Sequence, residues 1–173
     1  MLVELCDEGL TRHIGVSNFS VEQLTRVQGT APVETLQPPY SLIARDAEDE
    51  ILPFAESEGI GVIVYSPMGS GLLSGAMTRE RIESLPDDDW RTRSPQFSDP
   101  RLAENLALVE RLRIVGERHG TTPGTVAIAW TLRNPAVDGA IVGFRRPDQV
   151  DPIVAAANLE LDDEDVAEID GSA

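Results

Sequence analysis

Four short runs of β-prone residues in this sequence each end in side chains that can bind a polar ligand. Hydroxyl, amide and guanidinium groups donate hydrogen bonds, and an aromatic ring offers a flat face for stacking. The runs are His13–Ser17, Glu34–Gln37, Gly61–Tyr65 and Gly139–Gly143, and the residues at or just after their ends are Ser17, Asn18, Gln37, Tyr65, Ser66, Gly143, Arg145 and Arg146.

Two further features favour a phosphorylated ligand. The glycine- and serine-rich segment Ser66–Gly75 offers backbone and hydroxyl donors of the kind that cradle a pyrophosphate. Arg145 and Arg146 precede a predicted helix start at Pro147, where helix N-termini and arginine both favour anions. Taken singly, these residues are also typical of helix caps, turns, flexible loops and solvated surface. Their joint placement at the ends of successive strands is what favours function.

The predicted elements alternate between strand and helix four times along the chain. Such alternation is typical of an α/β fold with a parallel sheet covered by helices. In β/α barrels the active site lies at the carboxyl ends of the strands. We therefore expect a single domain over residues 1–173, built as a partial (β/α)8 TIM-type barrel of four parallel strands. The expected helices are 20–27, Ala47–Glu58, a short one at Thr78–Leu85, a long one opened by Asp99 and Pro100, one from Thr122, Pro147–Ala156 and one capped by Asp162.

Composition and charge exclude several classes of function. The chain has 173 residues, of which 41% are hydrophobic, and a net charge of −16, which disfavours nucleic acid and anionic membrane surfaces as partners. No apolar run approaches the roughly 20 residues of a membrane span, and the N-terminus does not read as a signal peptide. The single cysteine, Cys6, fits a reducing compartment, so we expect a cytoplasmic protein. The acidic runs 87–89 and 162–165 are interpreted as solvated charges, and no metal site is predicted.

The sequence resembles the aldo-keto reductase family, in the subset that includes bacterial members and potassium-channel β-subunits. The stretches that carry the resemblance are Ile14–Phe19, Leu36–Leu42 with Arg45, Gly61–Pro67 with Gly71–Leu73, Ala127–Trp130, and Ile141–Gly143 with Arg145 and Gln149. They extend over nearly the whole chain but match only the second half of the family fold, from the end of the fourth helix through strands five to eight.

The resemblance implies NADP(H) as cofactor and assigns it a set of contacts. Ser17, Asn18 and Gln37 would hydrogen-bond the nicotinamide carboxamide, and Tyr65 would stack on the ring. Ser66, Met68 and Ser70 would line the pyrophosphate path, and Gly143, Arg145 and Gln149 would contact the adenosine phosphate. One departure concerns the adenine: the Glu-Asn pair that the family uses there is Pro152-Ile153 in this chain.

A larger departure is the absence of the family's catalytic Asp, Tyr, Lys and His, which lie on strands two to four. The chain contains no lysine at all, so no lysine can lower the pKa of a substitute tyrosine. Tyr40 is the one weak candidate for a relocated acid, and His13 is interpreted as structural. We expect a chain that keeps the cofactor-binding half and lacks the catalytic half.

Three interpretations stay open at this point. The chain is an aldo-keto-reductase-like protein without its catalytic half, a repurposed non-redox enzyme such as a cyclase, lyase or isomerase, or a nucleotide-binding regulatory module. Four strands cannot close a barrel that needs about eight. We therefore expect a homodimer, or association with a complementary N-terminal half-barrel chain, together with a small-molecule ligand.

Overall fold

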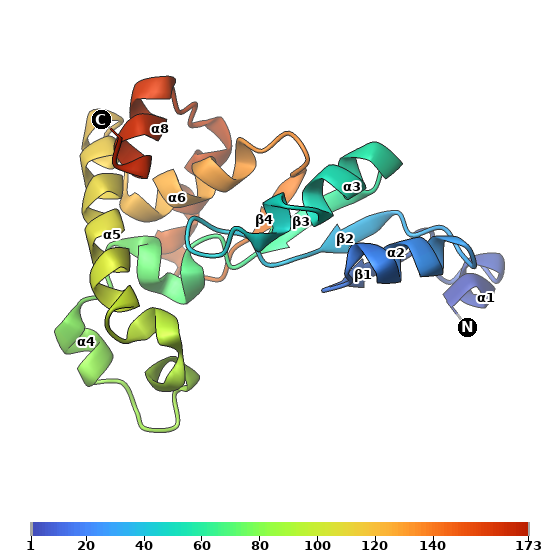
Figure 1. The fold of residues 1–173 in the computed structure, drawn as a ribbon, viewed down its shortest axis with the longest axis horizontal. Helices are drawn as coiled ribbons and strands as arrows, with labels where there is room; N and C mark the ends of the chain where they lie inside the picture. The colour runs from blue at the N-terminus through green and yellow to red at the C-terminus, as the bar shows by residue number, and fades with distance from the viewer. Residues whose placement is uncertain (1, 173) are drawn as a thin grey trace.

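A computed structural model describes residues 2–172 as an elongated α/β assembly (Figure 1). The first three helices lie beside a small sheet at the end of the molecule that holds the N-terminus, and the remaining helices gather at the opposite end. The strands are β1 (Gly15–Ser17), β2 (Thr35–Gln37), β3 (Gly61–Tyr65) and β4 (Gly139–Ile141). The α-helices are α1 (Leu2–Asp7), α2 (Val21–Gln28), α3 (Ile51–Glu58), α4 (Arg79–Glu83), α5 (Arg101–Arg118), α6 (Pro123–Leu132), α7 (Val150–Ala155) and α8 (Asp163–Asp170).

The four strands form one parallel sheet in the order β1-β2-β3-β4, which confirms the predicted α/β class. Gly15, Thr35 and Gly61 lie side by side across the first three strands, and Tyr65 pairs with Ile141 of β4. The first, second and fourth strands are shorter than the β-prone runs that predicted them. Because all strands run the same way, their carboxyl ends meet at one edge of the sheet.

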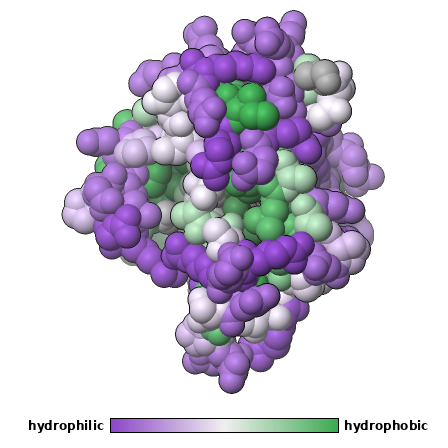
Figure 2. All heavy atoms as spheres, turned by 90° about the vertical axis from the view of Figure 1, so that its left-hand side faces the viewer, coloured by the Kyte–Doolittle hydropathy of each residue, from purple (hydrophilic) through white to green (hydrophobic). Residues whose placement is uncertain are grey.

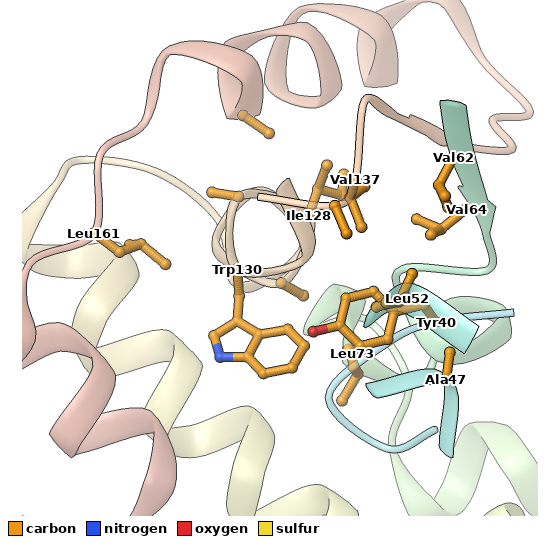
Figure 3. Packing of buried hydrophobic residues seen from close by; sticks show 14 of the residues in the cluster. Tyr40, Ala47, Leu52, Val62, Val64, Leu73, Ile128, Trp130, Val137 and Leu161 are labelled. Atoms are coloured by element: carbon orange, nitrogen blue, oxygen red, sulfur yellow. The ribbon is translucent and has the colours of Figure 1, made fainter. Parts of the chain in front are cut away.

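One face of the sheet is buried against helices. Leu36, Val62 and Val64 are fully buried and belong to the main core, together with Leu24 of α2 and Leu52 of α3. Figure 3 shows Val62 and Val64 facing Ile128 of α6 and Val137 across this core. Burial of side chains of this size stabilises the fold by about 1.5–3 kcal/mol each.

The opposite face of the sheet has little cover among the described residues. Ile63 and Tyr65 of β3 are half-buried, and Ile141 of β4 is 45% exposed. Ser17 and Gln37 continue the same face across β1 and β2 and are exposed. In a closed barrel this face would line the interior, so the four strands have the form of a half barrel.

Helix ends follow the predicted capping chemistry in most places. Ser20 and Gln23 form a reciprocal capping box at the start of α2, and Thr122 caps α6 ahead of Pro123. The prediction for α5 was wrong at its cap. Pro100 occupies the cap position without a side-chain cap, and Asp99 instead pairs with Arg79 through two contacts of 2.9 and 3.0 Å.

The long segment after β3 builds a second, smaller core. Leu72, Met77, Ile82, Phe97 and Leu102 pack together there, beside the N-terminal end of α5. On the side of the molecule that carries α4 and α5, an apolar hollow is framed by hydrophilic residues (Figure 2). A cavity of about 380 Å³ lies between residues 75–80 and α5, away from the carboxyl ends of the strands.

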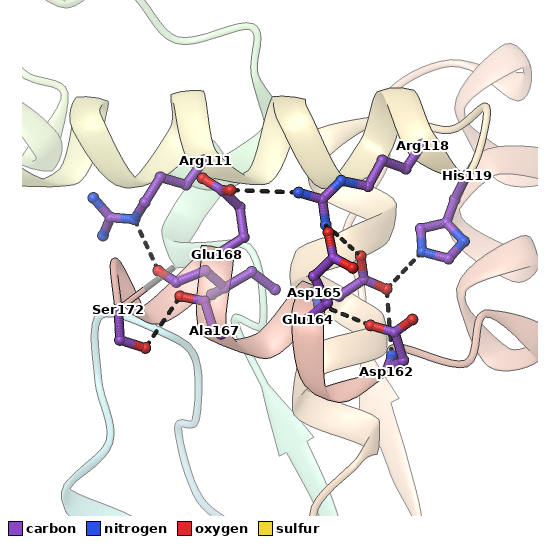
Figure 4. Close-up of polar contacts among 10 residues, drawn as sticks. Arg111, Arg118, His119, Asp162, Glu164, Asp165, Ala167, Glu168 and Ser172 are labelled. Atoms are coloured by element: carbon purple, nitrogen blue, oxygen red, sulfur yellow. Dashed lines mark hydrogen bonds and ion pairs between the residues drawn. The ribbon is translucent and has the colours of Figure 1, made fainter.

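The sequence led us to expect that the acidic run 162–165 is solvated, but one of its residues is buried. Asp165 is 2% exposed and accepts a hydrogen bond from Nε2 of His119 at 2.7 Å. It also lies 3.3 Å from Arg118 (Figure 4). The backbone N–H of Asp162 also donates to it. These contacts fasten α8 to the C-terminal end of α5.

Burial raises the pKa of Asp165, but the hydrogen bonds from His119 and from the Asp162 backbone outweigh it and hold the pKa below its usual value.

No helix within residues 2–172 is long and apolar enough to cross a membrane.

We predict that Asp165→Ala lowers the free energy of unfolding by about 2–3 kcal/mol at neutral pH, because hydrogen bonds to a buried carboxylate are lost. Since the folded-state pKa of Asp165 is depressed, this contribution is present above about pH 4 and is lost as the pH falls through the folded value. Urea unfolding at several pH values measures both effects. The exposed neighbour Asp163→Ala is the matched control. Equal losses for the two variants would contradict the assignment.

Candidate functional site

The carboxyl ends of β1, β2 and β3 bring four of the predicted site residues together. The Ser17 hydroxyl donates to the Gln37 carbonyl at 2.9 Å, and the backbone N–H of Asn18 donates to the same oxygen at 3.2 Å. The Tyr65 hydroxyl donates to Asn18 Oδ1 at 3.0 Å. Residues far apart in the sequence thus form one continuous rim, as their positions after parallel strands predict.

Backbone conformation sets how Asn18 of the rim and Ser66, which follows Tyr65, project. Asn18 has φ of 60° and Ser66 has φ of 59°, a left-handed region that few non-glycine residues adopt. Asparagine tolerates this region best among residues with a side chain, which accounts for Asn18 following the strand directly. The turn carries the side-chain amide back toward Tyr65, so an amide, a hydroxyl and an aromatic ring lie side by side.

The glycine-rich segment after β3 contributes in a more limited way than its composition indicates. Ser66 and Ser70 have hydroxyls without a hydrogen bond to any described residue, and Ser70 has φ of 57°. Met68 is half-buried and packs against the main core. A Cβ at Gly69 would lie 2.5 Å from Ile43, so this glycine is needed for internal packing. Of this segment, the two serines are the side chains open to a ligand.

The segment after β4 presents a cation on a fixed backbone. Gln149 Oε1 accepts hydrogen bonds from the backbone N–H groups of Arg145 at 2.8 Å and Arg146 at 3.1 Å. Arg146 pairs with Asp148, while the exposed Arg145 guanidinium makes no hydrogen bond to the described residues. A Cβ at Gly143 would meet nothing within 4 Å. The side-chain oxygen of Gln149 therefore holds the segment that carries Arg145.

Tyr40 lies in the core and not at the rim. It is 2% exposed, its ring centroid lies 5.4 Å from that of Trp130, and its hydroxyl donates to Glu48 at 2.6 Å (Figure 3). Burial, followed by the hydrogen bond to Glu48, raises its pKa far above the usual value. Arg45 holds Glu48 by a bidentate ion pair and lies over Trp130 at 4.9 Å. This geometry favours a structural role for Tyr40.

Local sequence patterns did not identify residues 89–97 as neighbours of the candidate site. Trp90 is 57% exposed and packs edge-on against Phe97, at a centroid distance of 6.2 Å. Hydrogen bonds from the Arg91 side chain and backbone, with a smaller effect of the Arg145 charge, lower the pKa of Asp89 to about 2. The exposed tryptophan in a long loop was the available signal. Its position in one cavity lining with Ser66 and Ser70 depends on long-range packing that no local pattern encodes.

Comparison with known proteins shows the family to which the chain belongs. The family model described as "Aldo/keto reductase family" matches residues 1–173. Aldo-keto reductase YhdN of Bacillus subtilis (strain 168) is 37% identical over 170 residues, which are 98% of this chain and 51% of that protein. Aldo-keto reductase str7 of Strobilurus tenacellus is 33% identical over 175 residues, covering 97% of this chain and 50% of that protein.

A solved structure extends the likeness to three dimensions. The glycerol dehydrogenase AKR11B4 from Gluconobacter oxydans superposes with a TM-score of 0.90 at 34% identity, over 99% of this chain and 51% of that one. The chain therefore belongs to the aldo/keto reductase family. It spans about half the length of the relatives that it matches.

Proposed function

We propose that this chain forms the NADP(H)-binding half of an aldo-keto reductase active site and does not reduce carbonyl compounds by itself. The observation that carries the proposal is the rim, where Ser17, Asn18, Gln37 and Tyr65 from three adjacent strands lie together. The family membership of the whole chain supports it. We expect the protein to act in the reducing cytoplasm.

The chemistry of the donor set fits a phosphorylated dinucleotide. The Arg145 guanidinium supplies a positive charge without a hydrogen-bonded partner in the described part of the chain, and Gly143 leaves open space beside it. The hydroxyls of Ser66 and Ser70, in the segment that follows Tyr65, make no hydrogen bond to a described residue and can also meet a phosphate. An otherwise strongly acidic chain repels anions at long range, so a local cation of this kind decides where a phosphate binds.

The residues of the rim would bind and orient the reactive ring. Gln37 and Asn18 carry amides suited to hydrogen-bond a carboxamide, and Tyr65 offers its face for stacking. Its hydroxyl bond to Asn18 fixes the orientation of that face. When bound, the nicotinamide supplies the hydride that carbonyl reduction needs.

Proton donation is the step for which these strands offer no suitable group. Reduction of a carbonyl requires an acid at its oxygen, and such acids contribute roughly 10²–10⁴-fold to rate. Tyr40 is buried with a raised pKa, and the chain has no lysine to lower the pKa of any tyrosine. We propose that a second copy of the chain or a complementary half-barrel chain covers the open sheet face, and that only the latter would restore catalysis.

The phosphate end is expected to dominate cofactor binding. Arg145→Ala should weaken the binding of NADPH by about 1.5–3 kcal/mol while changing the binding of NADH little, because a charge-assisted hydrogen bond to the extra phosphate is lost. Titration of cofactor fluorescence measures both affinities. Arg146→Ala is the matched control, since Arg146 already pairs with Asp148. Equal losses for NADPH and NADH on Arg145→Ala would show that Arg145 does not bind that phosphate.

The isolated chain is expected to turn over no carbonyl substrate at a rate typical of the family. The measurement is NADPH oxidation, followed by absorbance, with a reactive nitrobenzaldehyde and a full-length aldo-keto reductase as positive control. Robust turnover by the pure chain that is lost on Tyr40→Phe would contradict the proposal and make Tyr40 a relocated acid.

A further inference from the structure

A second cavity, of about 180 Å³, lies beside the rim between two segments that are distant in the sequence. One wall is the segment 39–44 that follows β2, the other is the segment 90–97 of the long loop, and Ser66, Gly69 and Ser70 complete the lining. Ile43, the exposed Trp90 and the buried Tyr40 and Phe97 are among the apolar residues of the lining, and Ser94 and Gln96 add polar groups. A cavity of roughly 150 Å³ holds one benzene ring, so this space suits a single ring.

Polar contacts connect the walls of the cavity. Gln96 Nε2 donates to the Ile43 carbonyl at 3.2 Å and so ties the two walls together at one end. Asn105 of α5, which is 7% exposed, donates to both the backbone and the side-chain oxygen of Gln96. Because these groups satisfy one another, the cavity is a property of the folded segments and does not need a ligand to form.

The open side of the cavity carries an aromatic side chain that the fold leaves unburied. Trp90 makes an edge-on contact with Phe97 yet keeps 57% of its surface exposed. Burying a large aromatic ring is normally favourable. The exposed surface of Trp90 beside a cavity of ring size is therefore available to contact a ligand. The Ser94 hydroxyl lines the same cavity and makes no hydrogen bond to another described residue.

We propose that this cavity binds a small, singly ringed aromatic molecule with a hydroxyl or carbonyl substituent, and that Trp90 covers the bound ring. The ring would pack among Tyr40, Ile43 and Phe97, and the substituent would meet the free hydroxyls of Ser94, Ser66 or Ser70. Ser66 and Ser70 are shared with the proposed cofactor path. The ring site itself does not require a bound dinucleotide.

The test is a titration of the whole chain with benzyl alcohol, in the absence of NADP(H), followed by two-dimensional amide NMR. We expect saturable shifts confined to the segments that line the cavity, 39–44, 66–70 and 90–97, with a Kd of about 1 mM, as is usual for a ligand with so few atoms. Trp90→Ala should weaken binding roughly two- to tenfold, the value of one aromatic pair. Ser94→Phe should fill the cavity and abolish the shifts.

The matched control is Phe144→Ala, which removes another exposed aromatic that does not line the cavity and should leave the affinity unchanged. If Ser94→Phe does not fold, as its own amide spectrum would reveal, the Trp90 and Phe144 pair still decides the question. Shifts that do not saturate, that spread over other segments, or that respond equally to Trp90→Ala and Phe144→Ala would overturn the proposal. Since no cofactor is present, failure of NADPH to bind would not alter this result.

Discussion

The arrangement of the molecule depends on one constraint, which is that a parallel sheet is stable when both of its faces are covered. Helices cover the face that carries Leu36, Val62 and Val64, and these side chains are fully buried. The face that carries Ile63, Tyr65 and Ile141 has no such cover among residues 2–172, and Ile141 is 45% exposed. One face of these short strands is therefore already covered by helices, whereas the other face still requires cover.

The uncovered face is also the face that bears the site. Ser17, Gln37 and Tyr65 project from it at the carboxyl ends of their strands, and the bond between Tyr65 and Asn18 shows that the rim is formed within this chain alone. Cover for the face and completion of the site are thus linked. Because Ile141 pairs with Tyr65, a partner that covered Ile141 would also lie over the rim, and under the proposed function its chemistry would decide whether a cofactor meets a proton donor.

Much of the fold followed from local sequence signals. The runs of β-prone residues gave the strands, and caps such as Ser20 and Thr122 gave the helix starts, because period and capping are local properties. Asp165 and Tyr40 could not be placed in this way. Their burial depends on α5 and on Glu48 and Trp130, contacts that only the tertiary fold creates. The rim residues were predictable because parallel strands align their ends.

The mass of the chain in solution tests most directly whether the open sheet face requires cover. Light scattering at micromolar concentration should give about twice the 18.8 kDa of one chain, more completely at high salt because a net charge of −16 on each copy is then screened. Ile141→Asp should shift the mass toward one chain, whereas Ile114→Asp, equally exposed on the outer helix α5, should not. A mass of one chain at every salt concentration, unchanged by Ile141→Asp, would contradict the account that a second copy covers the open face.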